Sequence, residues 1–236
     1  MDMIRHLLDL LYPRRSKCDI CGRPEAGAIC SACMAALDHL QGMTCIHCGK
    51  QLGSKYAYSA CPDCRNGVFH YERAYSCFEY SGVGKVLIHK LKYEGKVRLA
   101  GVIAQLMKDR LKNEGLEIHA IVPVPIHENK LLERGFNQSY LIARELGKRT
   151  GRPVVDCLVR TRDTTAQYNL DRAQRHMNIL DAFSVGLMYN IDKYKSILLV
   201  DDVYTTGSTS DECSRILKQA GADKVYVVTA ATGSNT

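Results

Sequence analysis

Four Cys-x-x-Cys pairs, all between residues 18 and 64, constrain this chain more than any other feature of its sequence. They hold eight of its 11 cysteines. Two sulfurs three residues apart on a tight turn can face one metal ion, and tetrahedral zinc takes two such pairs. The four pairs therefore predict two zinc ions. The predicted ligands are Cys18, Cys21, Cys30, Cys33, Cys45, Cys48, Cys61 and Cys64.

Redox-active pairs and disulfides are the alternative uses of these cysteines. The first residues lack the apolar stretch and the cleavage site of a secretory signal. A chain of 236 residues is also long enough to fold without disulfide cross-links. We therefore expect zinc, and with it a reducing, cytoplasmic location.

An internal repeat indicates how the pairs combine. CDICGRP at 18–24 resembles CIHCGKQ at 45–51, and CSAC at 30–33 resembles CPDC at 61–64. Two sequential units follow, each with one zinc ion between its own two pairs; an interleaved pairing remains open at this point. Glycine follows each knuckle, where a positive φ is often needed.

Composition and length set the domain organisation. The chain has 46% hydrophobic residues and a formal net charge of +7. It contains no run of about 18 apolar residues, so no transmembrane segment is predicted. We expect an N-terminal helix over 1–16, a cysteine-rich zinc-binding domain over 17–70 and a larger domain over 71–236.

The larger domain alternates apolar runs with amphipathic stretches. Strands are predicted at 72–80, 118–125, 154–159, 196–200 and 224–232, and helices at 83–113 (two, separated near Gly95), 139–151, 170–180 and 210–222. Buried strands between helices predict an α/β fold with a mainly parallel sheet flanked by helices.

The strongest chemical signal is ILLVDDVYTTGST at 197–209. A buried strand leads into Asp201 and Asp202, then into a loop of threonine, glycine and serine, then into a helix. Ligands bind at the carboxyl ends of such strands, and backbone N–H groups at a helix N-terminus cradle phosphate. The carboxylates suit sugar hydroxyls or hydrated Mg²⁺. The plainer interpretation is a polar turn that caps a helix.

This segment closely resembles the phosphoribosyl diphosphate motif of type I phosphoribosyltransferases. Over nearly its whole length the chain resembles the ComF-type competence proteins, which join a zinc-finger head to such a domain. Three further blocks carry the resemblance: LIHKLKYEGK at 87–96, VPVPIHENKLLERGFNQSYLIA at 122–143 and RTRDTTAQYNLDRAQRHMNILDAF at 160–183. It implies a type I phosphoribosyltransferase-like fold with a small double zinc-ribbon-like domain.

The resemblance also implies roles for individual residues. Asp201 and Asp202 would contact the ribose hydroxyls, directly or through Mg²⁺. A loop over 160–169 would close over the site. The other implied substrate-binding residues are Thr205, Thr206, Gly207, Ser208 and Thr209 for the 5-phosphate, Lys130 and Arg134 for the diphosphate, and Arg160 and Gln167 for the diphosphate or the base.

Two hypotheses follow for the function. In the first, the protein is a phosphoribosyltransferase that passes a pentosyl group from phosphoribosyl diphosphate, with Mg²⁺, to a nitrogen nucleophile, in the context of natural transformation. In the second, it is a non-catalytic sensor or scaffold. Its zinc head would then bind single-stranded DNA or a DNA-processing protein such as a competence helicase.

Overall fold

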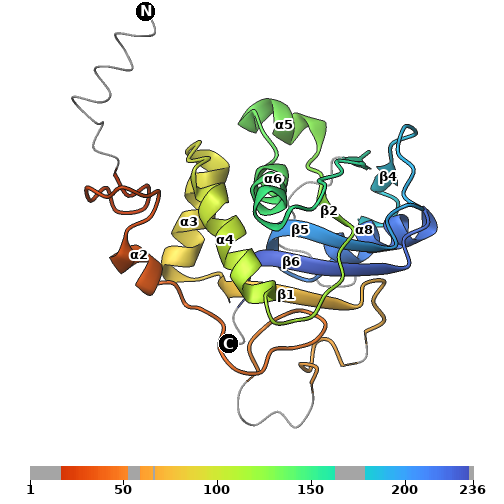
Figure 1. Cartoon of the computed structure of the whole chain (residues 1–236), viewed down its shortest axis with the longest axis horizontal. Helices are drawn as coiled ribbons and strands as arrows, with labels where there is room; N and C mark the ends of the chain where they lie inside the picture. Colours follow the sequence, from red (N-terminus) through yellow and green to blue (C-terminus); the bar gives the residue numbers. More distant parts are fainter. Residues whose placement is uncertain (1–16, 53–58, 66, 163–178, 234–236) are drawn as a thin grey trace, which may run out of the picture.

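The computed structural model describes residues 17–52, 59–65, 67–162 and 179–233. A four-stranded sheet forms the centre of the molecule, with the strand order β1-β6-β5-β2 and all neighbours parallel (Figure 1). The strands are β1 (Arg73–Glu79), β2 (Ala120–Pro123), β5 (Ser196–Tyr204) and β6 (Lys224–Thr232). Because every strand runs the same way, their carboxyl ends share one edge of the sheet.

Helices cover both faces of this sheet. Figure 1 shows α3 (Gly82–Tyr93), α4 (Leu99–Leu111) and α6 (Gln138–Thr150) side by side on one face. Their apolar residues pack against Leu198 and Val200 of β5. Helix α8 (Ser208–Gln219) packs against the alternate residues of the sheet, such as Leu199 and Val227. The predicted class, a mainly parallel sheet flanked by helices, is confirmed.

The end of β5 differs from the prediction in a way that matters for the site. The strand was expected to end at Val200, but it continues to Tyr204, because its pairing with the long β6 extends to Tyr204 and Thr232. Helix α8 also starts early, at Ser208. Both aspartates therefore lie within the strand, and the loop shrinks to Thr205–Gly207.

The strand predicted over 154–159 is largely wrong. Val154 makes a single bridge to Ile121 of β2, and the chain then leaves the sheet. Pro123 ends β2 without an N–H group to extend the ladder. The chain pairs instead as a separate antiparallel ribbon, β3 (Leu158–Arg160) with β4 (Phe183–Val185).

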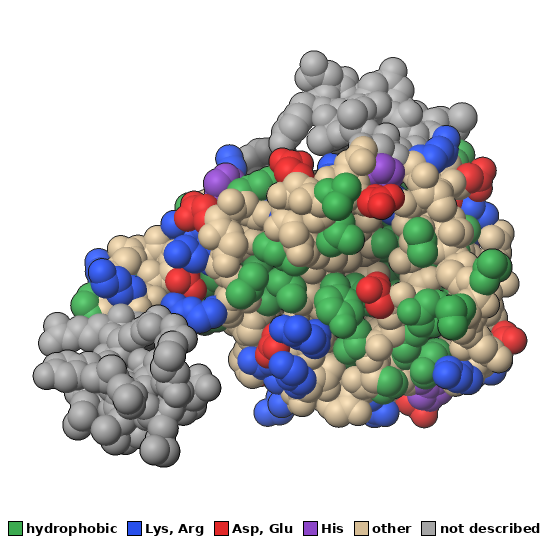
Figure 2. All heavy atoms as spheres, turned by 90° about the horizontal axis from the view of Figure 1, so that it is seen from above, with side chains coloured by type: hydrophobic (Ala, Val, Ile, Leu, Met, Phe, Trp, Pro, Cys, Tyr) green, Lys and Arg blue, Asp and Glu red, His purple; other side chains and the backbone are tan. Residues whose placement is uncertain are grey.

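Two further helices are short: α5 (Glu128–Arg134) follows β2, and α2 (Ser31–Ala35) lies among the N-terminal cysteines. The helix expected over 1–16 and most of the one expected over 170–180 lie outside the described residues. Among the described helices, none is long and apolar enough to span a bilayer. On the face drawn in Figure 2, acidic, basic and hydrophobic side chains are interspersed, without one continuous basic block.

Candidate functional site

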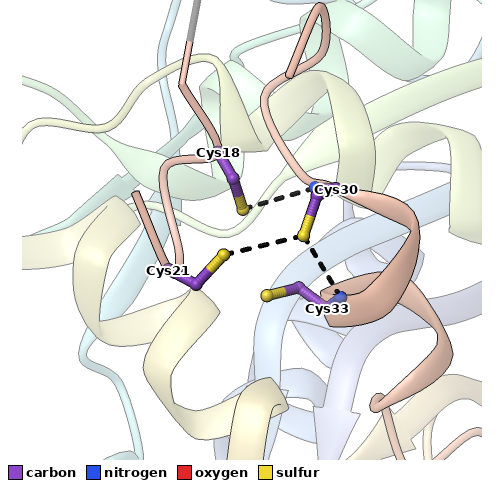
Figure 3. A group of neighbouring side chains, drawn as sticks. All are labelled: Cys18, Cys21, Cys30 and Cys33. Carbon is purple, nitrogen blue, oxygen red and sulfur yellow. Dashed lines mark hydrogen bonds between the residues drawn. The ribbon is translucent and has the colours of Figure 1, made fainter. Parts of the chain in front are cut away.

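The first four-cysteine group has the geometry of a zinc site (Figure 3). The four sulfurs of Cys18, Cys21, Cys30 and Cys33 lie within 4.8 Å of one another, and those of Cys21 and Cys30 are 3.6 Å apart. A zinc–sulfur bond of about 2.3 Å gives a tetrahedron with edges of about 3.8 Å, so these residues fit the ion. A disulfide needs about 2.05 Å between its sulfurs.

The second group, Cys45, Cys48, Cys61 and Cys64, repeats this geometry. Its sulfurs also lie within 4.8 Å of one another, and those of Cys48 and Cys61 are 3.6 Å apart. The sequential pairing is thus confirmed, and the interleaved pairing is excluded. The chain therefore has two zinc-binding sites, and together they contain all eight cysteines that the sequence predicts as ligands.

The two knuckles are built by the same backbone hydrogen bonds. Cys18 N–H donates to the carbonyl of Arg23, and Cys45 N–H donates to that of Lys50, both at 2.8 Å. Gly22 and Gly49 close the turns with φ of +78° and +71°, as the repeat predicted. The local sequence therefore specifies the knuckle, whatever surrounds it.

At the other candidate site, two aspartates lie side by side on β5 and are held by helices from elsewhere in the chain. Asp201 Oδ1 accepts a hydrogen bond of 2.9 Å from the Ser139 hydroxyl, at the start of α6. Asp202 Oδ1 accepts one of 2.8 Å from Lys92 Nζ, near the end of α3. Both carboxylates are thus fixed at the carboxyl edge of the sheet.

The surroundings of this edge raise the pKa values of both Asp201 and Lys92. Burial, together with the neighbouring Asp202 carboxylate, raises the pKa of Asp201 to about 7. Burial lowers the pKa of Lys92, but the Asp202 carboxylate, together with Asp201 and Tyr93, outweighs burial and raises the pKa of the lysine. Lys92 therefore stays protonated and neutralises Asp202.

One oxygen of this group has no partner among the residues that the structure describes. Asp202 Oδ2 is buried and accepts no hydrogen bond. Buried acceptors are nearly always satisfied, so an orphaned one marks a position where a ligand donor would fit. A ligand hydroxyl or a hydrated Mg²⁺ would supply such a donor, and the acidic pair fits either group.

The loop after β5 turns at a glycine and leads directly into α8. Gly207 has φ +84° and caps α8, and a side chain at this position would collide with the Tyr204 hydroxyl. Thr206 Oγ1 and Ser208 Oγ are 3.0 Å apart. Thr205 is exposed and Thr209 is half-buried. Because these residues surround the start of α8, their hydroxyls and the N–H groups of its first turn lie at the N-terminus of the helix.

The predicted cations have different surroundings. Helix α5, with Lys130 and Arg134, follows β2 at the same edge of the sheet. Arg134 is hydrogen-bonded to Gln138 and lies over the ring of Tyr93 at 5.2 Å, one residue from Lys92. It is therefore already held in the protein rather than free in solvent.

The prediction that Arg160 lies in a loop is wrong. Arg160 is the last residue of β3, which pairs with β4. Its guanidinium lies 5.5 Å from the centre of the Phe183 ring. Gln167 and most of the closing loop predicted over 160–169 lie outside the described residues. The structure therefore gathers the aspartates, the threonine loop and α5 at one edge, and places Arg160 on the neighbouring ribbon.

Sequence reasoning missed two residues of this edge. The sequence places Ser139 in a predicted helix and Lys92 in the block at 87–96, and neither pattern predicts a contact with the aspartates. The signal for Lys92 was a lysine among the apolar residues of a predicted helix, in a chain that also carries two acids at the end of a buried strand.

Comparisons with known proteins agree with the two four-cysteine groups. A double zinc ribbon domain matches residues 7–72. Competence protein F of Haemophilus influenzae is 28% identical over 205 residues, which cover 84% of this chain and 88% of the relative. The DNA utilization protein YhgH of Salmonella typhimurium is 30% identical over 219 residues, which cover 89% of this chain and 94% of the relative.

Among solved structures, the chain shows a partial likeness to a glutamine phosphoribosylpyrophosphate amidotransferase from B. subtilis. The TM-score is 0.39 at 18% identity, over 57% of this chain and 27% of that one. The assignment rests instead on the full-length relatives and on the two four-cysteine sites. The chain belongs to the ComF-type family of competence proteins.

Proposed function

We propose that this protein binds phosphoribosyl diphosphate at the carboxyl end of β5 and acts in the handling of DNA during natural transformation. The names of its relatives, a competence protein and a DNA utilization protein, support the biological context. The local chemistry of the β5 edge supports the ligand.

The observation that carries the proposal is the orphaned oxygen of Asp202. Lys92 holds Oδ1 and fixes the carboxylate, while Oδ2 is buried and accepts no hydrogen bond. A ribose hydroxyl would donate to Oδ2 and remove the cost of this unsatisfied acceptor. An unsatisfied carboxylate oxygen on the strand that leads into the proposed phosphate loop suits a sugar phosphate better than a nucleoside triphosphate.

The rest of the donor would fit along the same edge. Its 5-phosphate would lie on the loop Thr205–Gly207 and the N-terminus of α8, where backbone N–H groups and hydroxyls converge. Its diphosphate would face α5, where Lys130 and Arg134 offset the charge that develops on the leaving group.

Mg²⁺, when bound, would mask negative charge on the diphosphate. Lys92 already occupies one oxygen of Asp202 and neutralises it, so the carboxylate pair suits sugar hydroxyls better than direct, multidentate ligation of the metal. In this arrangement Asp201 and Asp202 orient the sugar.

We further propose a transferase reaction. The bond between C1 of the ribose and the diphosphate oxygen breaks, diphosphate leaves with the bonding electron pair, and a nitrogen nucleophile forms the new bond to C1. The fixed acids and cations would act by positioning the donor and stabilising charge.

Calorimetric titration with phosphoribosyl diphosphate, with and without Mg²⁺, tests the binding. We expect Asp202→Asn to weaken binding at least tenfold, because the amide places a donor where the hydroxyl needs an acceptor. Asp109→Asn, on the exposed surface of α4, is the matched control and should bind normally. No binding by the unmodified protein, or equal binding by Asp202→Asn, would overturn the proposal.

Release of diphosphate on mixing the donor with a panel of nitrogen bases tests the transfer step. Tight binding without release from any base would overturn the transferase proposal. It would leave the second hypothesis, a non-catalytic phosphoribosyl diphosphate sensor or scaffold.

A further inference from the structure

A cavity of about 240 Å³ lies between the second zinc site and the loop that follows β5. It brings together parts of the chain that the sequence separates by more than a hundred positions. Two zinc ligands and two threonines of the proposed phosphate cradle line the same space. Its lining residues are Cys48, Lys50, Asp63, Cys64, Tyr204, Thr205 and Thr206.

The electrostatics of this cavity single out Lys50. Four thiolates around one Zn²⁺ leave a net negative charge, and Asp63 adds another. These groups would repel a phosphate on the neighbouring loop. Lys50 is the cation among the lining residues, and its side chain is only 16% exposed, whereas that of Asp63 is 63% exposed.

The contact between Lys50 and Asp63 leaves the lysine able to serve another anion. Lys50 Nζ lies 3.5 Å from Asp63 Oδ2, at the long limit of a hydrogen bond. Water around the exposed Asp63 weakens this pair further. A phosphate in the cavity would offer shorter, charge-assisted hydrogen bonds to the ammonium group.

The chain that directly follows the second zinc unit (residues 45–64) is tied to the phosphate loop on both sides of it. Before the loop, the hydroxyls of Tyr71 and Tyr204 are 2.8 Å apart. After the loop, His70 N–H donates to Asp211 Oδ1 at 2.6 Å, in the first turn of α8. The zinc unit and the loop are therefore held in a fixed relation.

We propose that the second zinc unit completes the phosphate site, with the Lys50 ammonium group contacting a phosphate held at Thr205 and Thr206. This inference rests on the proposed function and extends it. The ligand class is a sugar 5-phosphate. The zinc knuckle fixes the lysine backbone, since the Lys50 carbonyl accepts the Cys45 N–H at 2.8 Å.

The internal repeat supplies a control for this proposal. Arg23 occupies the position of Lys50 in the first knuckle, and its carbonyl accepts the Cys18 N–H at the same 2.8 Å. Its side chain is exposed, and it does not line the cavity. The two cations differ in surroundings but not in local structure.

Calorimetric titration with ribose 5-phosphate and with phosphoribosyl diphosphate tests the inference. We expect Lys50→Met to weaken binding of both ligands about tenfold, Lys50→Arg to retain most of the affinity, and Arg23→Met to match the unmodified protein. Metal analysis should find the same zinc content in all four proteins, so that loss of the metal does not explain the change.

The outcomes separate this inference from the proposed function. If the unmodified protein binds and Lys50→Met binds equally well, the role of Lys50 is overturned while the site at β5 stands. If the unmodified protein binds neither ligand, both proposals fall. Weaker binding by Arg23→Met as well would show a general effect of charge and would also overturn the role of Lys50.

Discussion

The two zinc units have the same local structure but very different surroundings. The sulfurs of Cys18 and Cys45 accept from Cys30 N–H and Cys61 N–H, both at 3.3 Å. Yet the first unit has an exposed ligand, Cys21, whereas all four cysteines of the second are buried. The two copies of the motif therefore offer the metal the same four ligands but differ in how deeply they are buried in the protein.

The difference lies in what each unit packs against. The first unit's cysteines form a small cluster of their own with Ile20, Ile29 and Val83, and only these partly buried residues also pack against the core of the sheet. The second unit's cysteines belong to the same core as Leu199 of β5 and Leu217 of α8. We therefore expect metal binding at the first unit to stabilise the sheet domain less than metal binding at the second, whose cysteines are themselves part of the core.

The largest test of this comparison removes one zinc ligand from each unit. We expect Cys61→Ser to lower the main thermal transition by roughly 10 °C or more, because zinc binding is coupled to folding of the shared core. Cys30→Ser, at the equivalent position, should lower it by less than about half as much. Thermal unfolding followed by circular dichroism, with zinc analysis of both proteins, measures this.

Equal shifts for the two cysteine variants would contradict the comparison, because they would show that both zinc ions stabilise the sheet domain alike.

A smaller effect is expected from the glycines that close the two knuckles. A Cβ at Gly49 would lie 2.9 Å from both the N and Oγ atoms of Ser76 on β1, whereas one at Gly22 would meet nothing within 4 Å. Both have positive φ, so Gly22→Ala should cost about 1 kcal/mol from strain alone. Gly49→Ala adds crowding and should cost about 3 kcal/mol.

Denaturant unfolding measures the two glycine variants. A Gly49→Ala protein as stable as Gly22→Ala would mean that the second knuckle is not packed tightly on β1.

The smallest effect concerns the bond between the second unit and the phosphate loop. Tyr71→Phe removes the contact with the Tyr204 hydroxyl and should lower the free energy of unfolding by about 1 kcal/mol. Tyr80→Phe, whose side chain is 37% exposed, is the control and should change it by less than about 0.5 kcal/mol. Urea unfolding followed by fluorescence compares them, and equal effects would argue against this link.

Local patterns in the sequence predicted much of the fold. The spacing of the cysteines and the repeat of the knuckles favoured the sequential metal pairing but left the interleaved one open, which the positions of the sulfurs then excluded. Helix α6, predicted over 139–151, was found at Gln138–Thr150, ended by Gly151 with φ +69°. The prediction of a strand at 154–159 was wrong because the available neighbouring strands, rather than the β-propensity of the segment, decide where it pairs.

The partners of the site residues were beyond such reasoning. Lys92 and Asp202 are 110 positions apart, and His70 and Asp211 are 141 apart. No local pattern links them, since the parallel sheet and the helix packing bring them together. The cavity beside Lys50 likewise exists only because the second zinc unit packs against the end of β5.

The most direct measurement is a crystal structure of the protein with phosphoribosyl diphosphate and Mg²⁺. We predict a ribose hydroxyl within hydrogen-bonding distance of Asp202 Oδ2, and the 5-phosphate on the loop from Thr205 to Gly207 with Lys50 Nζ beside it. A donor bound away from the carboxyl end of β5, or an Asp202 oxygen satisfied by another part of the chain, would contradict the account.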